Sequence, residues 1–125
     1  MIILDTSIWI EFLKNNPVYY STVKDLLENR KILAIECIFG ELLQGAKNKR
    51  EIEVISLYWE NLPKAIIEYG WIEAGKYSSQ NKLTSHGVGL IDSFIIVTAR
   101  KFDAQIWSLD KKLNSLLKKE ERFNF

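Results

Sequence analysis

Short apolar runs alternate with longer segments of helical spacing along this chain, and that alternation limits the possible folds more than any other feature. Apolar runs at residues 2–4, 32–35 and 104–108 have the length of strands, and each is followed by a segment with helical periodicity. Strands separated by helices pair in parallel, because the chain must cross back before the next strand begins. The sequence therefore predicts a three-layer α/β/α domain with a central parallel sheet flanked by helices.

Predicted helices fill most of the chain between these runs. We expect them at residues 8–13, 18–29, 38–46, 51–61, 68–82, 90–102 and 111–119. With 125 residues and no repeat or Gly/Ser linker, the chain is expected to form one domain, residues 1–125. No stretch reaches the roughly 20 apolar residues of a membrane helix, and no signal peptide is apparent, so we expect no membrane contact and a cytoplasmic location.

Four acidic residues stand at comparable places relative to these predicted elements. Asp5 and Asp110 follow apolar runs, whereas Glu41 and Asp92 lie in the opening turns of helical segments. Parallel strands end at the same edge of a sheet, where α/β proteins bind their ligands, so we expect the four acids to meet there. Asp103 precedes the third run and is expected at the opposite edge, roughly 15–20 Å from Asp110.

A cluster of acids from distant parts of a chain favours a bound cation, because carboxylates brought together repel one another and lose hydration. Each acid taken alone could simply stabilise a helix N-terminus. Asp92, however, is the only formal charge between Lys82 and Arg100. Mg²⁺ or Mn²⁺ suits oxygen ligands, whereas one His and one Cys offer little to zinc. Metal-assisted hydrolysis of a phosphodiester is the reaction that such a site favours.

Four motifs carry these acids in a fixed order along nearly the whole chain. They are MIILDTS at residues 1–7, GELLQGA at 40–46, GLIDSFIIVTA at 89–99 and SLD at 108–110. Their combination resembles the PIN-domain ribonucleases and, within them, the VapC toxins of toxin–antitoxin pairs. The resemblance implies a PIN-like fold, Mg²⁺- or Mn²⁺-dependent endonucleolytic cleavage of RNA, a homodimer, and neutralisation by a VapB-type antitoxin.

The same resemblance implies roles for individual residues. It assigns catalysis and metal binding to Asp5, Glu41, Asp92 and Asp110, and a supporting role to Thr6 or Ser7. Glu36 competes with Glu41 for the position after the second run, and the pattern alone does not separate them. The resemblance favours Glu41.

Further candidates lie beside the motifs. Thr6, Ser7 and Ser108 could position a water or a phosphate oxygen, although capping and turn formation explain them equally well. The net charge of +1 gives no general case for nucleic-acid binding, so such a case needs local basic groups. Two basic groups could contact RNA phosphates or could simply be solvated. The first is Lys47, Lys49 and Arg50, and the second is Lys111 and Lys112.

Two other functions remain open at this point. A catalytically inactive PIN-like module would bind RNA or an antitoxin without cutting RNA. An aspartyl-phosphate phosphatase or a phospho-receiver domain would also place an acid after a parallel strand, but Ser7 stands where such phosphatases have a second Asp.

Overall fold

Two parallel strands, β1 (Ile2–Leu4) and β2 (Gln105–Trp107), form the centre of the structure although they lie at opposite ends of the chain. In the computed structural model, which describes residues 1–125, Ile3 lies opposite Ile106. Side chains on both strands are almost entirely apolar and buried, as expected for a parallel sheet covered on both faces. The predicted parallel pairing of the first and third apolar runs is confirmed.

Single parallel bridges extend the sheet on both sides of this pair. They join Ile2 to Ile32, Ala34 to Lys64, and Ile106 to Arg122. The predicted second strand is thus extended backbone beside β1, held by isolated bridges instead of a continuous ladder. Across the sheet, the extended backbone lies in the order Lys64, residues 32–34, β1, β2 and Arg122. In chain order these are the third, second, first, fourth and fifth segments. The order reverses between β1 and β2, and such a reversal is where α/β proteins open a binding crevice.

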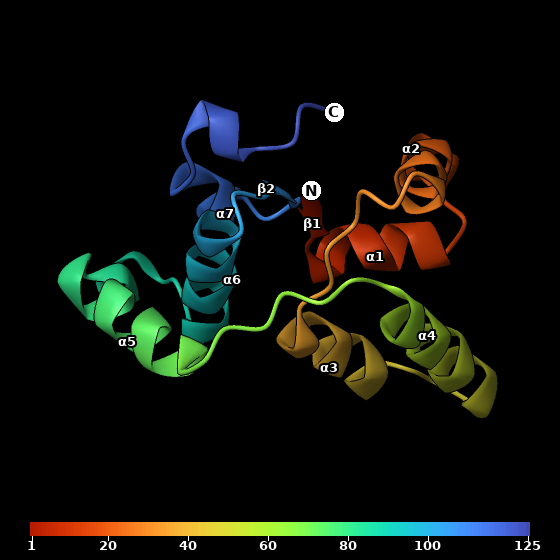
Figure 1. Cartoon of the computed structure of the whole chain (residues 1–125), viewed down its shortest axis with the longest axis horizontal. Helices are drawn as coiled ribbons and strands as arrows, with labels where there is room; N and C mark the ends of the chain where they lie inside the picture. Colours follow the sequence, from red (N-terminus) through yellow and green to blue (C-terminus); the bar gives the residue numbers. More distant parts are fainter.

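Seven α-helices and two short 3-10 helices surround the sheet. They are α1 (Thr6–Leu13), α2 (Pro17–Glu28), α3 (Glu36–Gln44), α4 (Lys49–Asn61), α5 (Gly70–Gln80), η1 (Leu83–His86), α6 (Leu90–Lys101), α7 (Lys111–Ser115) and η2 (Lys119–Glu121). Figure 1 shows α5 packed along α6 on one side of the strands, and α1 to α4 gathered on the other side. The expected fold class, a parallel sheet between helical layers, is confirmed. None of the helices combines the length and apolar character needed to span a membrane.

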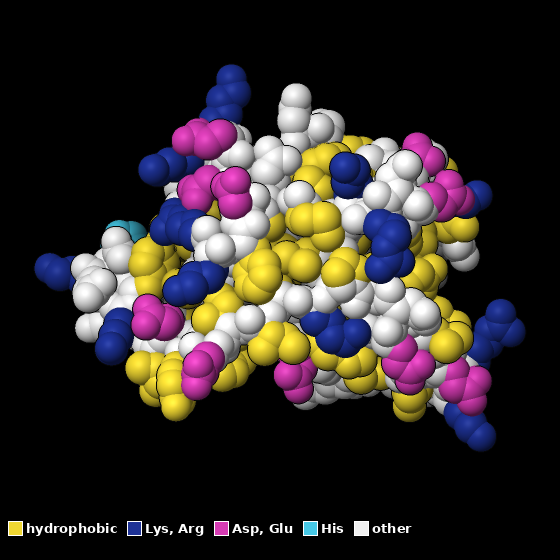
Figure 2. All heavy atoms as spheres, viewed as in Figure 1, with side chains coloured by type: hydrophobic (Ala, Val, Ile, Leu, Met, Phe, Trp, Pro, Cys, Tyr) yellow, Lys and Arg dark blue, Asp and Glu magenta, His cyan; other side chains and the backbone are white.

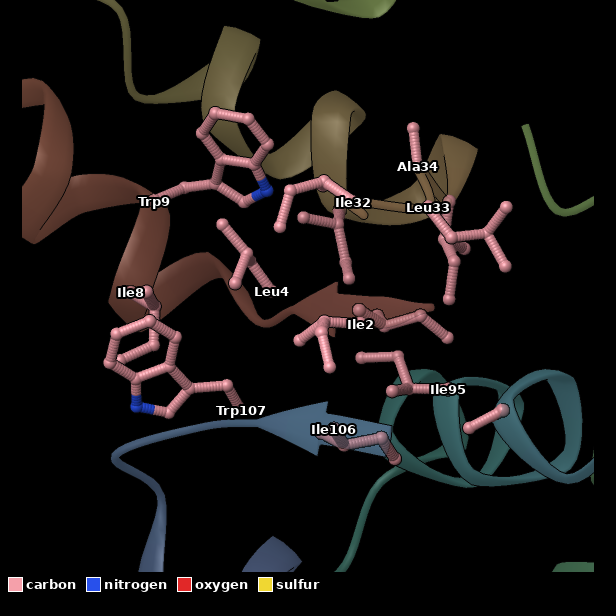
Figure 3. Close-up of a cluster of buried hydrophobic side chains, with 14 of the residues drawn as sticks. Ile2, Leu4, Ile8, Trp9, Ile32, Leu33, Ala34, Ile95, Ile106 and Trp107 are labelled. Carbon is pink, nitrogen blue, oxygen red and sulfur yellow. The ribbon is translucent and has the colours of Figure 1, made fainter. Parts of the chain in front are cut away.

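The core is built around the two strands. Figure 3 shows side chains from β1, β2, α1, α6 and the extended segment at residues 32–34 meeting there. Ile3, Ile8 and Ile95 are fully buried, and Trp9 is 1% exposed. Because residues from both ends of the sequence share this one cluster, the carboxyl ends of β1 and β2 are held in fixed positions.

The C-terminal segment differs from the prediction. The helix expected at residues 111–119 ends at Ser115, and residues 119–121 form η2 instead. Arg100 of α6 donates two hydrogen bonds to Glu121, at 2.8 and 3.2 Å, which also accepts the backbone N–H of Lys118 at 2.8 Å. These bonds draw the segment back onto α6, so that the Phe123 N–H reaches the carbonyl oxygen of Ile106.

The bond to Arg100 lowers the pKa of Glu121, so the ionised carboxylate stabilises the fold. We expect Glu121→Ala to lower the free energy of unfolding by about 1 kcal/mol at neutral pH. This contribution is present above the unfolded pKa near 4.5 and is lost as the pH falls through the lower folded value. Denaturant unfolding of both proteins at neutral and acidic pH measures it. Glu120→Ala is the matched control, and an equal effect of both substitutions would contradict the assignment.

Candidate functional site

Side chains from four separate parts of the chain line one pocket at the carboxyl end of the sheet. The pocket has a volume of about 340 Å³ and is open to solvent. Its lining residues are Asp5, Thr6, Glu41, Gly89, Leu90, Ile91, Asp92 and Asp110. The four acids that the sequence singles out are therefore brought together, whereas Asp103 lies elsewhere. No lysine, arginine or histidine is among the lining residues.

Asp5 stands between the end of β1 and the start of α1, and its side chain is held from both. Its backbone N–H donates to the carbonyl oxygen of Trp107 at 2.9 Å, which continues the pairing of β1 with β2. Its Oδ1 accepts the N–H of Thr6 at 2.8 Å, as the N-cap of α1. Asp5 is only 8% exposed, so this carboxylate has lost most of its contact with water.

Ser108 joins the two acids at the strand ends. Its hydroxyl donates to Oδ2 of Asp5 at 2.6 Å and accepts the N–H of Asp110 at 2.9 Å. The Ser7 hydroxyl, 3.5 Å from the same Asp5 oxygen, accepts the N–H of Leu109 at 3.1 Å. The two buried or half-buried hydroxyls thus fix the loop after β2 against Asp5. Neither serine lines the pocket itself.

Asp110 is the N-cap of α7. Its Oδ1 accepts the N–H groups of Lys112 and Leu113, at 2.8 and 3.3 Å, and its other oxygen has no protein partner. The side chain of Asn114 donates to the carbonyl oxygen of Ser108 at 2.9 Å, which fixes the same turn from the helix side. Capping and pocket lining are therefore compatible roles of one carboxylate.

Glu41 and Asp92 reach the pocket from helices. Glu41, in α3, accepts a hydrogen bond from the Thr6 hydroxyl at 3.1 Å. Asp92, in the first turn of α6, makes no hydrogen bond to the protein. Burial, and after it the negative charges of Asp110, Asp5 and Glu41, raise the pKa of Asp92 to about 6. The same surroundings raise the pKa of the nearby Cys37 thiol to about 12, mainly by burial and then by the charge of Glu41.

The remaining candidates lie outside the pocket. Glu36, at the start of α3, is exposed and does not line it. The two basic groups are exposed near the starts of α4 and α7. One contact was not foreseen from the sequence: the ammonium nitrogen of Lys112 lies 3.0 Å from the point where a Cβ on Gly87 would stand. In the sequence, only the glycines of the loop before α6 indicated that another group could approach this loop closely.

The composition of the pocket fits a hard divalent cation. None of the four acids forms an ion pair. The three ion pairs of the structure involve other residues. Several carboxylates without a positive partner are what Mg²⁺ or Mn²⁺ neutralises. As they lie in the structure, no three His, Cys, Asp or Glu side chains form a group that could hold a metal ion. An ion held through few carboxylates and several waters, as Mg²⁺ usually is, matches this open arrangement.

Comparison with known proteins gives one family and a group of similar structures. The family model for the PIN domain matches residues 2–119. A chain in the structure of VapBC2 from Rickettsia felis, bound to a DNA fragment from their promoter, is 20% identical with a TM-score of 0.71, covering 98% of this chain and 96% of that chain.

Two further structures are similar in fold. A chain of VapBC-1 from nontypeable Haemophilus influenzae is 25% identical with a TM-score of 0.66 and coverages of 92% and 91%. A chain of FitAcB from Neisseria gonorrhoeae is 17% identical with a TM-score of 0.54 and coverages of 90% and 90%. No curated protein sequence matches significantly.

The raised pKa of Asp92 predicts that its ionised form destabilises the metal-free protein. The folded value of about 6 exceeds the unfolded value near 3.8, so stability falls as the pH rises between these values. We expect Asp92→Asn to raise the free energy of unfolding by about 1 kcal/mol at neutral pH, after allowance for solvent screening.

Denaturant unfolding in the presence of a chelator tests this expectation. The gain should disappear as the pH falls toward 4, the unfolded range of an aspartate. Asp25→Asn removes an exposed acid of α2 and serves as the control. A variant at position 92 that is no more stable than the parent at neutral pH would contradict the electrostatic origin of the shift.

Proposed function

The chain belongs to the PIN domain family, and on this premise we propose that it is a metal-dependent endoribonuclease that hydrolyses RNA phosphodiester bonds. The observation that carries the proposal is the pocket in which Asp5, Glu41, Asp92 and Asp110 meet without a positive partner. A hydrolase of this kind needs little from the protein beyond a metal site that is open to a phosphate. The pocket is open to solvent, and its volume of about 340 Å³ leaves room for a phosphate group.

The chain's own residues divide the work of such a site. Asp5, Glu41, Asp92 and Asp110 would hold one or two Mg²⁺ or Mn²⁺ ions. When bound, a divalent cation supplies charge stabilisation for the phosphate and lowers the pKa of a water. Ser108 holds Asp5 in place, and Thr6 holds Glu41, so neither carboxylate must be ordered when substrate arrives. Asp92, which lacks a protein hydrogen bond, is the acid most in need of a cation.

We propose further that the protein is a VapC-type toxin that forms a homodimer and pairs with a VapB-type antitoxin. The similar structures from Rickettsia felis and Haemophilus influenzae are described as VapBC assemblies, which supports a partner of that kind. Apolar side chains gathered at the start of α5 also favour a protein interface (Figure 2), because Ile66, Tyr69 and Ile72 are more than half exposed. We also propose that the chain forms one domain with one core and acts in the cytoplasm.

The first test compares matched acid substitutions in the purified protein. Asp5→Asn and Glu41→Gln should each lower the rate of RNA cleavage at least about 100-fold, because each removes a proposed metal ligand. Glu36→Gln lies outside the pocket and should cleave at the rate of the parent. Cleavage should also stop in a chelator and resume with Mg²⁺ or Mn²⁺. Normal cleavage by Asp5→Asn would refute the assignment.

The same experiment separates the alternative functions. An inactive PIN-like module would bind RNA and cut none with any divalent ion. A phosphatase or phospho-receiver would instead acquire a label on an aspartate from a small phosphoryl donor. The phosphatase or phospho-receiver function is disfavoured because the Asp5 carboxylate accepts from three hydrogen-bond donors and the residue is only 8% exposed.

Ser108→Ala tests whether the hydroxyl between the strand ends positions Asp5. We expect Mn²⁺ affinity and kcat to fall about tenfold, since hydrogen bonds to metal ligands commonly contribute that much. Titration of Mn²⁺ by electron paramagnetic resonance, beside RNA cleavage rates, measures both effects. Ser78→Ala, at another buried serine, controls for packing. Unchanged Mn²⁺ affinity would show that Ser108 acts only in the fold.

A further inference from the structure

We propose that Lys112 is the residue that binds an RNA phosphate at the edge of the acidic pocket, an inference that rests on the proposed ribonuclease function. Five basic residues were candidates for this role from the sequence. Lys112 is the one whose ammonium group lies beside Gly87, two residues before Gly89 of the pocket lining. The structure therefore distinguishes one cation from a set that charge patterning treats alike.

Lys112 contacts two segments that lead into the pocket, one through its backbone and one through the end of its side chain. Its backbone N–H is 2.8 Å from Oδ1 of Asp110, which lines the pocket. Its other end lies over Gly87, where an added Cβ would meet Nζ at 3.0 Å and Cε at 3.7 Å. Gly89 and Leu90, two and three residues farther on, line the pocket as well. The ammonium group thus lies against the loop that enters the pocket lining, on a residue whose backbone is bonded to an acid of the pocket.

This ammonium group has no partner within the protein. Lys112 forms no ion pair, and its Nζ donates no hydrogen bond to another residue. A solvated lysine would also be unpaired, but this one ends in the space that the missing side chain of Gly87 leaves. Gly87 has φ of +74° and supplies that space. A side chain at position 87 would meet the lysine as well as an unfavourable backbone conformation.

Removal of the Lys112 charge should affect RNA and the divalent cation differently. An RNA phosphate is attracted by the ammonium group, so its loss weakens RNA binding. A divalent cation in the pocket is repelled by the same group, so its loss leaves cation binding unchanged or tighter. A general disruption of the site would weaken both. The pair of measurements therefore separates a phosphate contact from a structural role.

The experiment measures binding of a fluorescently labelled single-stranded RNA to the full-length Asp92→Asn protein, which is expected not to cut it. Lys112→Ala should weaken binding about threefold to tenfold, and should reduce the slope of log affinity against log salt by about 0.7. Lys112→Arg should keep the parental slope. Lys101→Ala, which removes an equal charge at the far end of α6, should bind RNA within about twofold of the parent.

A second substitution tests the location of the ammonium group. Any effect of Gly87→Ala on RNA binding in the parent should be smaller in the Lys112→Ala background, because the added methyl group meets the end of the lysine. Thermal melting establishes that each variant is folded. Mn²⁺ titration of Lys112→Ala in the otherwise native protein should show no loss of affinity.

Defined results overturn the inference. Equal affinity and equal salt slope for the parent and Lys112→Ala would do so while leaving the ribonuclease proposal intact, since the parent would still bind RNA and the native protein would still cut it. Weakened Mn²⁺ binding by Lys112→Ala would assign the lysine to the fold instead. If the parent binds no RNA and the native protein cuts none, both proposals fail together.

Discussion

The buried carboxylate of Asp5 is the group around which the rest of the site is arranged. It ends β1, begins α1 and receives the hydroxyl of Ser108, so one side chain connects three parts of the fold. The register of β1 with β2 places Ser108 within 2.6 Å of it, and the next residues carry Asp110 to the same edge. A shift of one residue in this register would reverse the faces of the strand and separate the two acids. The pocket therefore depends on the pairing of two strands that are 100 residues apart in the sequence.

Gathering negative charge in this way opposes folding, and the surrounding core offsets the cost. Each acid is anchored next to apolar residues that are fully buried: Leu4 and Ile8 flank Asp5, and Ile95 follows Asp92 in α6. Burying one such side chain contributes about 1.5–3 kcal/mol, which exceeds the repulsion carried by one half-exposed carboxylate. The acids can remain unpaired because the elements that hold them are fixed by other contacts.

Local patterns predicted the central elements but not the edges of the sheet. Apolar runs and helical spacing depend on residues close in sequence, so β1, β2 and all seven helices were anticipated to within a few residues. The bridges at Lys64 and Arg122 involve single residues, whose pairing is decided by tertiary contacts that no local pattern records. The early end of α7 has the same origin. The segment after it is held by hydrogen bonds between Arg100 and Glu121, which are 21 residues apart.

The placement of the site residues follows a similar division. Strand direction sufficed to bring acids to one edge, but it did not distinguish Glu36 from Glu41. Five residues apart on α3, they point about 140° apart around the helix, so only one can face the pocket. Which one does so depends on how α3 rests on the sheet. Lys112 shows the same limit more strongly, because a run of lysines gives no direction to its ammonium groups, whereas the structure places one of them beside Gly87.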